Sequence, residues 1–494
     1  MIFRNGFFPL LLLCTSLTIA QEPTELTLDQ CIALAFRQSF PMQTATQQFI
    51  ASKKSYEAQA LSVASSLDLT VNAPEYNESL SSQFDPVSQT YQFYYLQTNY
   101  TQSNLTLSQP VAPTGGTLTL TGEFYKLNQT TVQTGSSINE EDYFSNFLVQ
   151  IRQPLFYPNT LKITRDQANL QLQESYSTFG RNQLDALYQI ISAFYNAYQL
   201  SQQEQISGDQ VKQNQESYET AQNKYGAGLI PEVDLLQSEV DLATSQNQKL
   251  SDHHDCSSAK NTLKVLLGLP LDKEITLIAD TNYSPIAVDE STAVSKALQN
   301  RAELLNAQRD RDLADMNIDL VSSQRHVRFD LTASYGLNRN DTQFDEVFHN
   351  FDRSRAISLQ MTLPIFDWSR HAREVESAEA QFKNAELNYA NTEQQIRQEI
   401  IDLISRISEV QSRIQLLHKS VEVAQKGYDI SLERFRAGTE TRNDLAQAQQ
   451  RLTTSRLNNL VALIDYRLSI ADLTRKTFWD FEKNQPVEIK YPEE

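Results

Sequence analysis

The dominant pattern in the sequence is a 3–4 spacing of apolar residues through residues 369–435, a stretch with no proline and one late glycine. This spacing places the apolar side chains on one helix face and is typical of a coiled-coil seam. Between Ile396 and Ile400 the pattern shifts by four residues, which indicates a stutter that changes the local winding. At 1.5 Å per residue the helix is about 100 Å long. A helix of that length predicts a tall tubular or fibrous protein.

Helical spacing recurs in five further segments, and Gly or Pro residues separate several of them. The predicted helices are 28–65, 159–225, 231–267, 288–326 and 441–477. Pro41 should divide the first of these into two pieces that meet near Phe40. The Gly-containing breaks at 226–228 and 437–439 should turn each long helix back into a return helix.

Apolar and polar residues alternate in the segments that precede the two long helices. A period of two predicts strands with one apolar and one polar face. The predicted strands are about 115–127, 145–155, 327–340 and 355–365. Aromatic residues gather near their ends, which fits either a soluble sheet or a membrane β-barrel with aromatic girdles. Alternation alone does not separate these two interpretations.

The two halves of the chain match each other at a constant offset of 210 residues. Pro154-Leu155-Phe156 falls on Pro364-Ile365-Phe366, and Ala227-Gly228 falls on Ala437-Gly438. The opening helices match at an offset of 262 instead, so the first half should contain an insertion of about 50 residues. Its placement is open: it is either residues 66–114, or it lies inside the loop between the two strands.

These matches define the predicted organisation. Residues 1–20 form a signal peptide, 21–268 the first repeat, 269–286 a connector, 287–478 the second repeat and 479–494 an irregular tail. Four strands per chain are too few for a barrel, which needs at least about eight. If the strands lie in a membrane, other subunits must therefore satisfy the sheet edges.

Charge and cysteine content narrow the possible partners and the compartment. A formal charge of −19 disfavours nucleic acid as a partner, because nothing offsets phosphate repulsion. Arg4 followed by an apolar run and Thr18-Ile19-Ala20 predicts secretion, with cleavage before Gln21. Cys14 suggests a lipoprotein signal, but the bulky Leu11 and Leu13 argue against lipidation. Cys31 and Cys256 remain, and two distant cysteines are not a disulfide framework.

Over nearly all of its mature length the chain resembles the TolC family of outer-membrane efflux proteins. The order and spacing of four motifs carry the resemblance: two strand exits, Gln153–Phe156 and Leu363–Phe366, and two turns, Tyr225–Leu229 with Asp234 and Phe435–Thr439 with Asp444. The resemblance implies a homotrimer with a twelve-stranded β-barrel and a twelve-helix α-barrel. It also implies docking to a periplasmic adaptor protein and an inner-membrane RND or ABC pump.

The resemblance assigns candidate sites. The turns that should meet the adaptor hold Tyr225, Gly226, Ala227, Gly228, Phe435, Ala437 and Gly438, and the strand-to-helix exits hold Pro154, Phe156, Pro364 and Phe366. In well-known members the second turn carries a Tyr, an Arg and two Asp residues that hold the tip shut. The matching positions here are Phe435, Glu440, Asp444 and Gln447, so only one of the four is retained.

Asp234 and Asp444 each follow a glycine break by six residues, and two roles are open for them. They can stabilise the start of the return helix through its dipole. Alternatively, copies around a symmetry axis can form an acidic ring at the entrance, which would favour cations.

Enzyme chemistry finds little support in the sequence. Adjacent histidines in Asp252-His253-His254-Asp255-Cys256 point about 100° apart on a helix, so they do not readily share a metal ion. No metal site, cofactor or catalytic group is expected. The leading hypothesis is a passive outer-membrane exit duct of a tripartite efflux or type I secretion system. The alternative is a secreted coiled-coil structural or adhesive protein, in which the strands form a soluble sheet.

Overall fold

The computed structural model describes residues 24–133, 136–280 and 283–492, and these divide into two compact units. The helical unit comprises the described residues up to Gln47, Phe179–Asn300 and the chain from Ile396 onward, and the sheet unit comprises Gln48–Thr178 and Arg301–Gln395. The α-helices are α1 (Leu28–Gln38), α2 (Phe40–Ala60), α3 (Thr160–Gly226), α4 (Glu232–Leu267), α5 (Glu290–Asn300), α6 (Ala302–Ser323), α7 (Arg370–Arg436) and α8 (Arg442–Thr477). α3 and α7 both contain 67 residues, so each is about 100 Å long.

The breaks within the shorter helices were only partly predicted. The chain is extended at Ser39, one residue before Phe40, as Pro41 indicated. The prediction of one continuous helix over 288–326 is wrong, because the chain is also extended at Arg301 between α5 and α6. No proline marks this break. Asn300 instead donates from Nδ2 to the Thr477 carbonyl over 3.1 Å, so a long-range contact secures the end of α5.

The core of the helical unit lies where α1, α3 and α4 meet a two-stranded parallel sheet. β1 (Thr24–Thr27) pairs with β6 (Ile275–Ile278), which gives the predicted connector a strand. Cys31, Phe194 and Leu263 are fully buried in this core. α4 ends in the left-handed Gly268, where an added Cβ would lie 2.6 Å from the Gln38 carbonyl oxygen. A close backbone approach therefore requires glycine there.

The C-terminal tail contains two strands of two residues each and is otherwise irregular through residue 492, but its path is fixed by contacts. β9 (Trp479–Asp480) pairs with β10 (Gln485–Pro486), and the chain then runs along α3. The Gln183 side chain and the Lys490 backbone form two reciprocal hydrogen bonds of 3.0 Å. The ring of Tyr491 contacts that of Phe179 at a centroid distance of 5.6 Å. Side chains far away in sequence thus fix a segment whose own sequence shows no periodicity.

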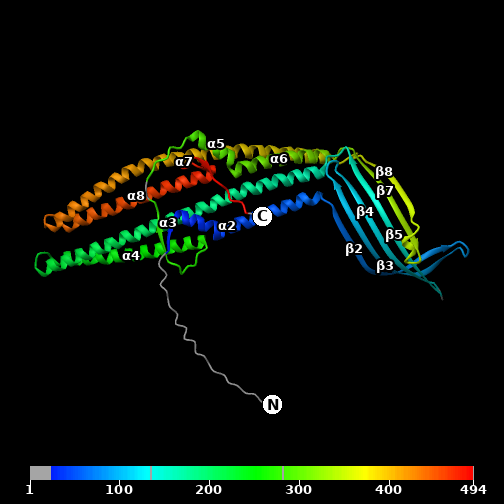
Figure 1. The fold of residues 1–494 in the computed structure, drawn as a ribbon, viewed down its shortest axis with the longest axis horizontal. Helices are drawn as coiled ribbons and strands as arrows, with labels where there is room; N and C mark the ends of the chain where they lie inside the picture. Colours follow the sequence, from blue (N-terminus) through cyan, green and yellow to red (C-terminus); the bar gives the residue numbers. More distant parts are fainter. Residues whose placement is uncertain (1–23, 134–135, 281–282, 493–494) are drawn as a thin grey trace, which may run out of the picture. The chain divides into compact units, whose positions relative to one another are not determined.

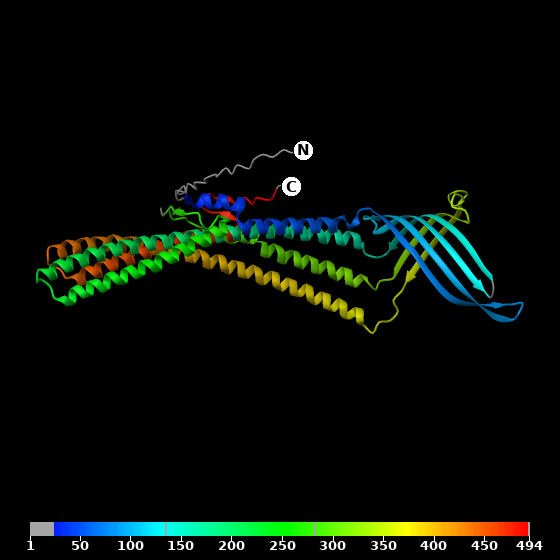
Figure 2. The same cartoon turned by 90° about the horizontal axis from the view of Figure 1, so that it is seen from below.

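The sheet unit contains one antiparallel sheet of six strands, so the prediction of four strands per chain is wrong. The strands are β2 (Ser66–Asp85), β3 (Thr90–Val111), β4 (Gly116–Gln133), β5 (Ser136–Leu155), β7 (Arg328–Asp341) and β8 (Asp352–Thr362). They follow one another across the sheet in this order (Figures 1 and 2). β4 and β5 pair as far as Gln133 and Ser136, beyond the predicted strand ends at 127 and 145.

Two strands beyond the predicted four, β2 and β3, fall in residues 66–114, which is one of the two places open to the insertion. The alternation of β2 is hidden because its register against β3 shifts between Asn72 and Glu75. A bulge adds a residue to one strand and reverses which positions face outward. Pro74 sits within this irregularity, where its missing N–H costs no ladder hydrogen bond. A search for unbroken alternation therefore fails across β2.

Candidate functional site

The two turns at the ends of the long helices share one geometry, 210 residues apart. Gly228 and Gly438 have φ angles of +72° and +77°. The amide of Gly228 donates to Tyr225 O and that of Leu229 to Lys224 O, both over 2.9 Å. Gly438 and Thr439 make the equivalent bonds to Phe435 O and Arg434 O. This is the Schellman termination, in which a left-handed residue follows the last helical turn and glycine adopts it without steric cost.

The predicted docking residues of the first turn are exposed. Tyr225 is 40% and Leu229 is 73% exposed, and Gly226, Ala227 and Gly228 are also exposed. In the second turn, Ala437 and Gly438 are exposed, whereas Phe435 is half-buried beneath the Lys224 ammonium, 4.9 Å from its ring centroid. No atom lies within 4 Å of an added Cβ at either turn glycine, so only their φ angles demand glycine.

The candidate entrance residues near the second turn are held by local contacts. Thr441 and Asp444 form a capping box at the start of α8: Thr441 Oγ1 accepts from the Asp444 amide, and the Asp444 carboxylate accepts from the Thr441 amide over 3.3 Å. Glu440 accepts a hydrogen bond of 2.9 Å from Ser431, and Gln447 accepts one of 3.2 Å from Arg451. The exposed Asp234 lies in the first turn of α4.

One ion pair near the turns was not predicted from the sequence. Arg442, at the start of α8, is ion-paired through Nη2 with Asp241 of α4, and this contact ties the two helical hairpins together. Gln237 holds Asp241 by donating to its Oδ1 over 3.0 Å. Burial lowers the pKa of the Arg442 guanidinium, while the nearby Asp234 carboxylate opposes that change.

The sheet presents one continuous apolar surface, which we call the apolar belt. Its members lie on all six strands, point to the same side, and are between 37% and 81% exposed. The belt comprises Leu67, Leu69, Val71, Leu105, Leu120, Phe147, Val149, Ile151, Tyr335, Ile357, Leu359 and Met361. A contiguous exposed surface of this kind marks a membrane or protein interface.

Aromatic side chains border the belt at both ends. At the loop end, Phe124 stacks on Phe348 with a centroid distance of 5.9 Å, and Tyr143 meets Phe344 at 5.7 Å. At the helix end, the exits leave Phe156 81%, Phe366 69% and Trp368 86% exposed. Pro154 still pairs with Asp330 in the ladder, and Pro364 is half-buried just after β8. Apolar strands between aromatic girdles are the arrangement of a membrane β-barrel.

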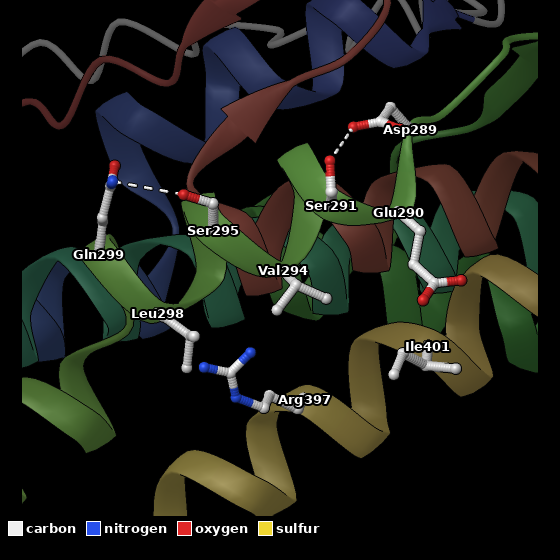
Figure 3. A pocket seen from close by; sticks show the side chains of 9 residues that line it. All are labelled: Asp289, Glu290, Ser291, Val294, Ser295, Leu298, Gln299, Arg397 and Ile401. Carbon is white, nitrogen blue, oxygen red and sulfur yellow. Dashed lines mark hydrogen bonds between the residues drawn. The ribbon is translucent and has the colours of Figure 1, made fainter.

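A cavity and two polar clusters elsewhere in the helical unit are explained by helix packing and local hydrogen bonds. A cavity of about 720 Å³ lies between α5 and α7 in the helical unit (Figure 3). On its rim the Asp289 carboxylate accepts hydrogen bonds from Ser291 and Thr292, which lower its pKa and make it the N-terminal cap of α5. Nδ1 of His253 lies 2.7 Å from Oε1 of Glu204 on α3, within hydrogen-bond distance. Within the described ranges, no three His, Cys, Asp or Glu side chains are placed to bind a metal ion together.

No helix in the described part of the chain is both long enough and apolar enough to cross a membrane.

Comparison with known proteins agrees with this geometry. The family model for outer membrane efflux proteins matches residues 112–269 and 293–476. Nodulation protein T of Rhizobium leguminosarum bv. trifolii is 19% identical over 359 residues, which cover 72% of this chain and 74% of that protein. The solvent efflux pump outer membrane protein SrpC of Pseudomonas putida is 21% identical over 240 residues, which cover 49% of this chain and 51% of that protein.

Solved structures share the fold. The Campylobacter jejuni CmeC outer membrane channel superposes with a TM-score of 0.69 at 14% identity, covering 94% of this chain and 87% of that one. CusC gives a TM-score of 0.68 at 13% identity and covers 91% of both chains. The alternative of a secreted structural protein is set aside, because the family match spans both halves of the chain. The chain belongs to the outer membrane efflux protein family, and it is an outer-membrane exit duct for an efflux system.

Proposed function

We propose that the chain works as a homotrimer in a tripartite efflux or type I secretion system. Its partners are a periplasmic adaptor protein and an inner-membrane RND or ABC pump. The duct itself is passive, since the pump supplies the energy. The observation that carries the proposal is the pair of equivalent, exposed glycine turns at Gly228 and Gly438. In three copies, α3, α4, α7 and α8 would supply the twelve helices of a periplasmic tunnel.

The turns are proposed as the adaptor docking surface. Gly226, Ala227, Gly228, Ala437 and Gly438 carry little or no side chain, so a partner backbone can approach closely. Beside them, the 73% exposed Leu229 provides an apolar anchor of the kind that dominates binding energy at protein interfaces.

The closed entrance is proposed to rest on the Arg442–Asp241 ion pair together with the acidic and polar residues around it. Asp234, Glu440, Asp444 and Gln447 lie in the same two turn regions. Arg442 stands two positions after Glu440, so it can supply the positive charge that the family pattern places at the latter position. Repeated in each copy, the ion pair would hold the return helices inward until the adaptor binds.

The two halves are proposed to descend from one duplicated unit. The turn glycines lie 210 residues apart, and the extended residues Ser39 and Arg301, which divide α1 from α2 and α5 from α6, lie 262 apart. These are the two offsets that the sequence matches give. In each half a strand leads into the long helix: β5 precedes α3 and β8 precedes α7.

Site-directed crosslinking tests the proposal. Leu229→Cys should crosslink to the adaptor protein encoded near the gene in cells that express the pump. Leu250→Cys is a matched control, because Leu250 is 70% exposed on the return helix α4, 21 residues further along the chain than Leu229. Crosslinks from both positions alike, or from neither, would remove the basis for docking at the turns.

A further inference from the structure

The apolar belt does not stop at the four strands that the family pattern predicts. Leu67 and Leu69 on β2 continue it, through Leu107 and Leu105 on β3, to Leu120 and Gly122 on β4. The β2 side chains are as exposed as those on the opposite edge strand: Leu69 is 67% exposed and Leu359 on β8 is 60% exposed. A hairpin lying outside the membrane would have no reason to extend the belt in register.

The other face of the hairpin is polar in the same way as the rest of the sheet. Asp68 and Thr106 are paired, and Thr106 in turn pairs with Thr121 of β4. Asn72 donates to Gln102 over 3.1 Å, and Gln102 reaches Glu123 of β4. Strands that are apolar outside and polar inside are what a water-filled barrel requires. The insertion therefore has both faces of a barrel hairpin.

The sheet is open at β2 and β8, because within the described residues neither edge strand has a second partner. An unpaired strand edge cannot face lipid, since no water is available to satisfy its N–H and C=O groups. The two edges are complementary: β2 runs away from its helix and β8 runs toward its own, so they can pair antiparallel. Leu67, Leu69 and Val71 lie near the helix end of β2, as Met361, Leu359 and Ile357 do on β8.

The stagger of the sheet also fits closure. Direct partners starting from Leu67 run through Leu107, Leu120, Val149 and Tyr335 to Arg355. Leu67 lies one residue from the helix end of β2, whereas Arg355 lies seven from the helix end of β8, an advance of six residues over the five spacings between the six strands. With a rise of about 3.3 Å per residue and about 4.8 Å between strands, this advance corresponds to a strand tilt of roughly 40°, which lies in the range typical of closed barrels.

We propose that β2–β3 is part of the membrane barrel and that β8 of one copy pairs with β2 of the next. The inference rests on the proposed homotrimer: with six strands per copy, three copies close a barrel of eighteen strands instead of twelve. Barrel diameter grows about linearly with strand number, so the lumen is about 1.5 times as wide as that of a twelve-stranded duct.

Disulfide crosslinking between copies tests the junction in the full-length protein in outer membranes. With helix ends aligned, Leu359 faces Leu69 of the next copy, so the chain carrying both Leu359→Cys and Leu69→Cys should form crosslinked oligomers under mild oxidation. Pairing Leu359→Cys with Leu67→Cys or Val71→Cys covers a stagger of two residues in either direction. The matched control combines Leu359→Cys with Leu120→Cys on β4, the strand that would form the junction of a twelve-stranded barrel.

Crosslinks to β2 and not to β4 are the expected result, and crosslinks to β4 overturn the inference. A second measurement covers variants that crosslink poorly. Leu69→Lys places a charge on the lipid face and should reduce the assembled oligomer several-fold, whereas Thr70→Lys on the polar face should not. If both lysine substitutions leave the amount of assembled oligomer unchanged, the hairpin lies outside the membrane. A trimer by native mass with β4 crosslinks rejects only the eighteen strands, whereas a monomer rejects the proposed function itself.

Discussion

Arg442 of α8 and Asp241 of α4 are ion-paired, and their contact joins two helical hairpins that belong to different halves of the chain. Both side chains are only partly exposed, at 26% and 35%. Asp241 is positioned further by Gln237 and, through its carbonyl, by Asn214. The ion pair therefore holds the two helical hairpins together near their turns.

Breaking this ion pair should open the duct. Arg442→Gln and Asp241→Asn should each raise the single-channel current in planar bilayers, because each removes a tie of about 0.2–1 kcal/mol per copy. The double variant should add little to either single one. Arg451→Gln is the control, since Arg451 bonds only to Gln447 on its own helix among the contacts described. Additive effects in the double variant would show that the two residues act separately.

The turn glycines should tolerate little change. Gly438→Val should weaken adaptor coupling and efflux in cells, because a side chain in the left-handed conformation costs about 1–2 kcal/mol. Trimer yield should stay near normal. Gly427→Ala is the matched control: Gly427 lies within α7 with open space around it, and alanine favours a helix by about 0.5–1 kcal/mol. Normal efflux by Gly438→Val contradicts the docking role.

Two substitutions separate the possible roles of Asp444. Thr441→Ala breaks the capping box but keeps the charge, and should lower stability by about 0.5–2 kcal/mol. Asp444→Asn removes the charge but keeps a side-chain acceptor, and should weaken block of the channel by divalent cations. Block is measured as the concentration that halves the current. If Asp444→Asn leaves that concentration unchanged, only the capping role remains.

The native cysteines should be inert in the folded protein. Burial raises the pKa of Cys31 to about 12, and burial together with a hydrogen bond to Glu204 raises that of Cys256. The thiolate is the reactive form, so at pH 8 a thiol reagent should modify neither residue until denaturant is added. Folding favours the neutral thiol of Cys31, so this thiol stabilises the folded protein fully below pH 9, and the stabilisation falls as the pH rises toward 12. Rapid labelling at pH 8 under native conditions would contradict this burial.

Membrane topology offers an independent check. Gln343 is exposed in the loop between β7 and β8, and Leu229 is exposed at the first helical turn. An impermeant thiol reagent should label Gln343→Cys on intact cells, but Leu229→Cys only after the outer membrane is permeabilised. The reverse order would invert the proposed orientation.

Features that depend on local chemistry were predictable from the sequence. Both turn glycines are left-handed, because only a residue without a Cβ takes that conformation freely at the end of a helix. The long helices begin and end within one residue of the predicted bounds, as an unbroken 3–4 spacing allows.

Features that depend on contacts between distant parts of the chain were not predictable from the sequence. The register shift in β2 reverses which of its positions face outward, and this concealed the alternation of that strand. The role of Arg442 was not predicted because the position where the family pattern places an arginine holds Glu440. Its partner Asp241 lies about 200 residues earlier, and no pattern near Arg442 indicates that contact. The ordered tail depends likewise on Gln183, which pairs with Lys490 from another part of the chain.

The turn between β3 and β4, residues 112–115, bears on how such ducts change in evolution. Both ends of a two-stranded hairpin lie at the same end of the sheet. Adding or removing one therefore leaves the direction of every other strand unchanged. The helices attached to β2, β5, β7 and β8 then keep their places in the chain order. In the proposed homotrimer, one hairpin added to the gene would add three hairpins to the barrel and widen its aperture by a discrete step, while the helices that meet the partners stay unchanged.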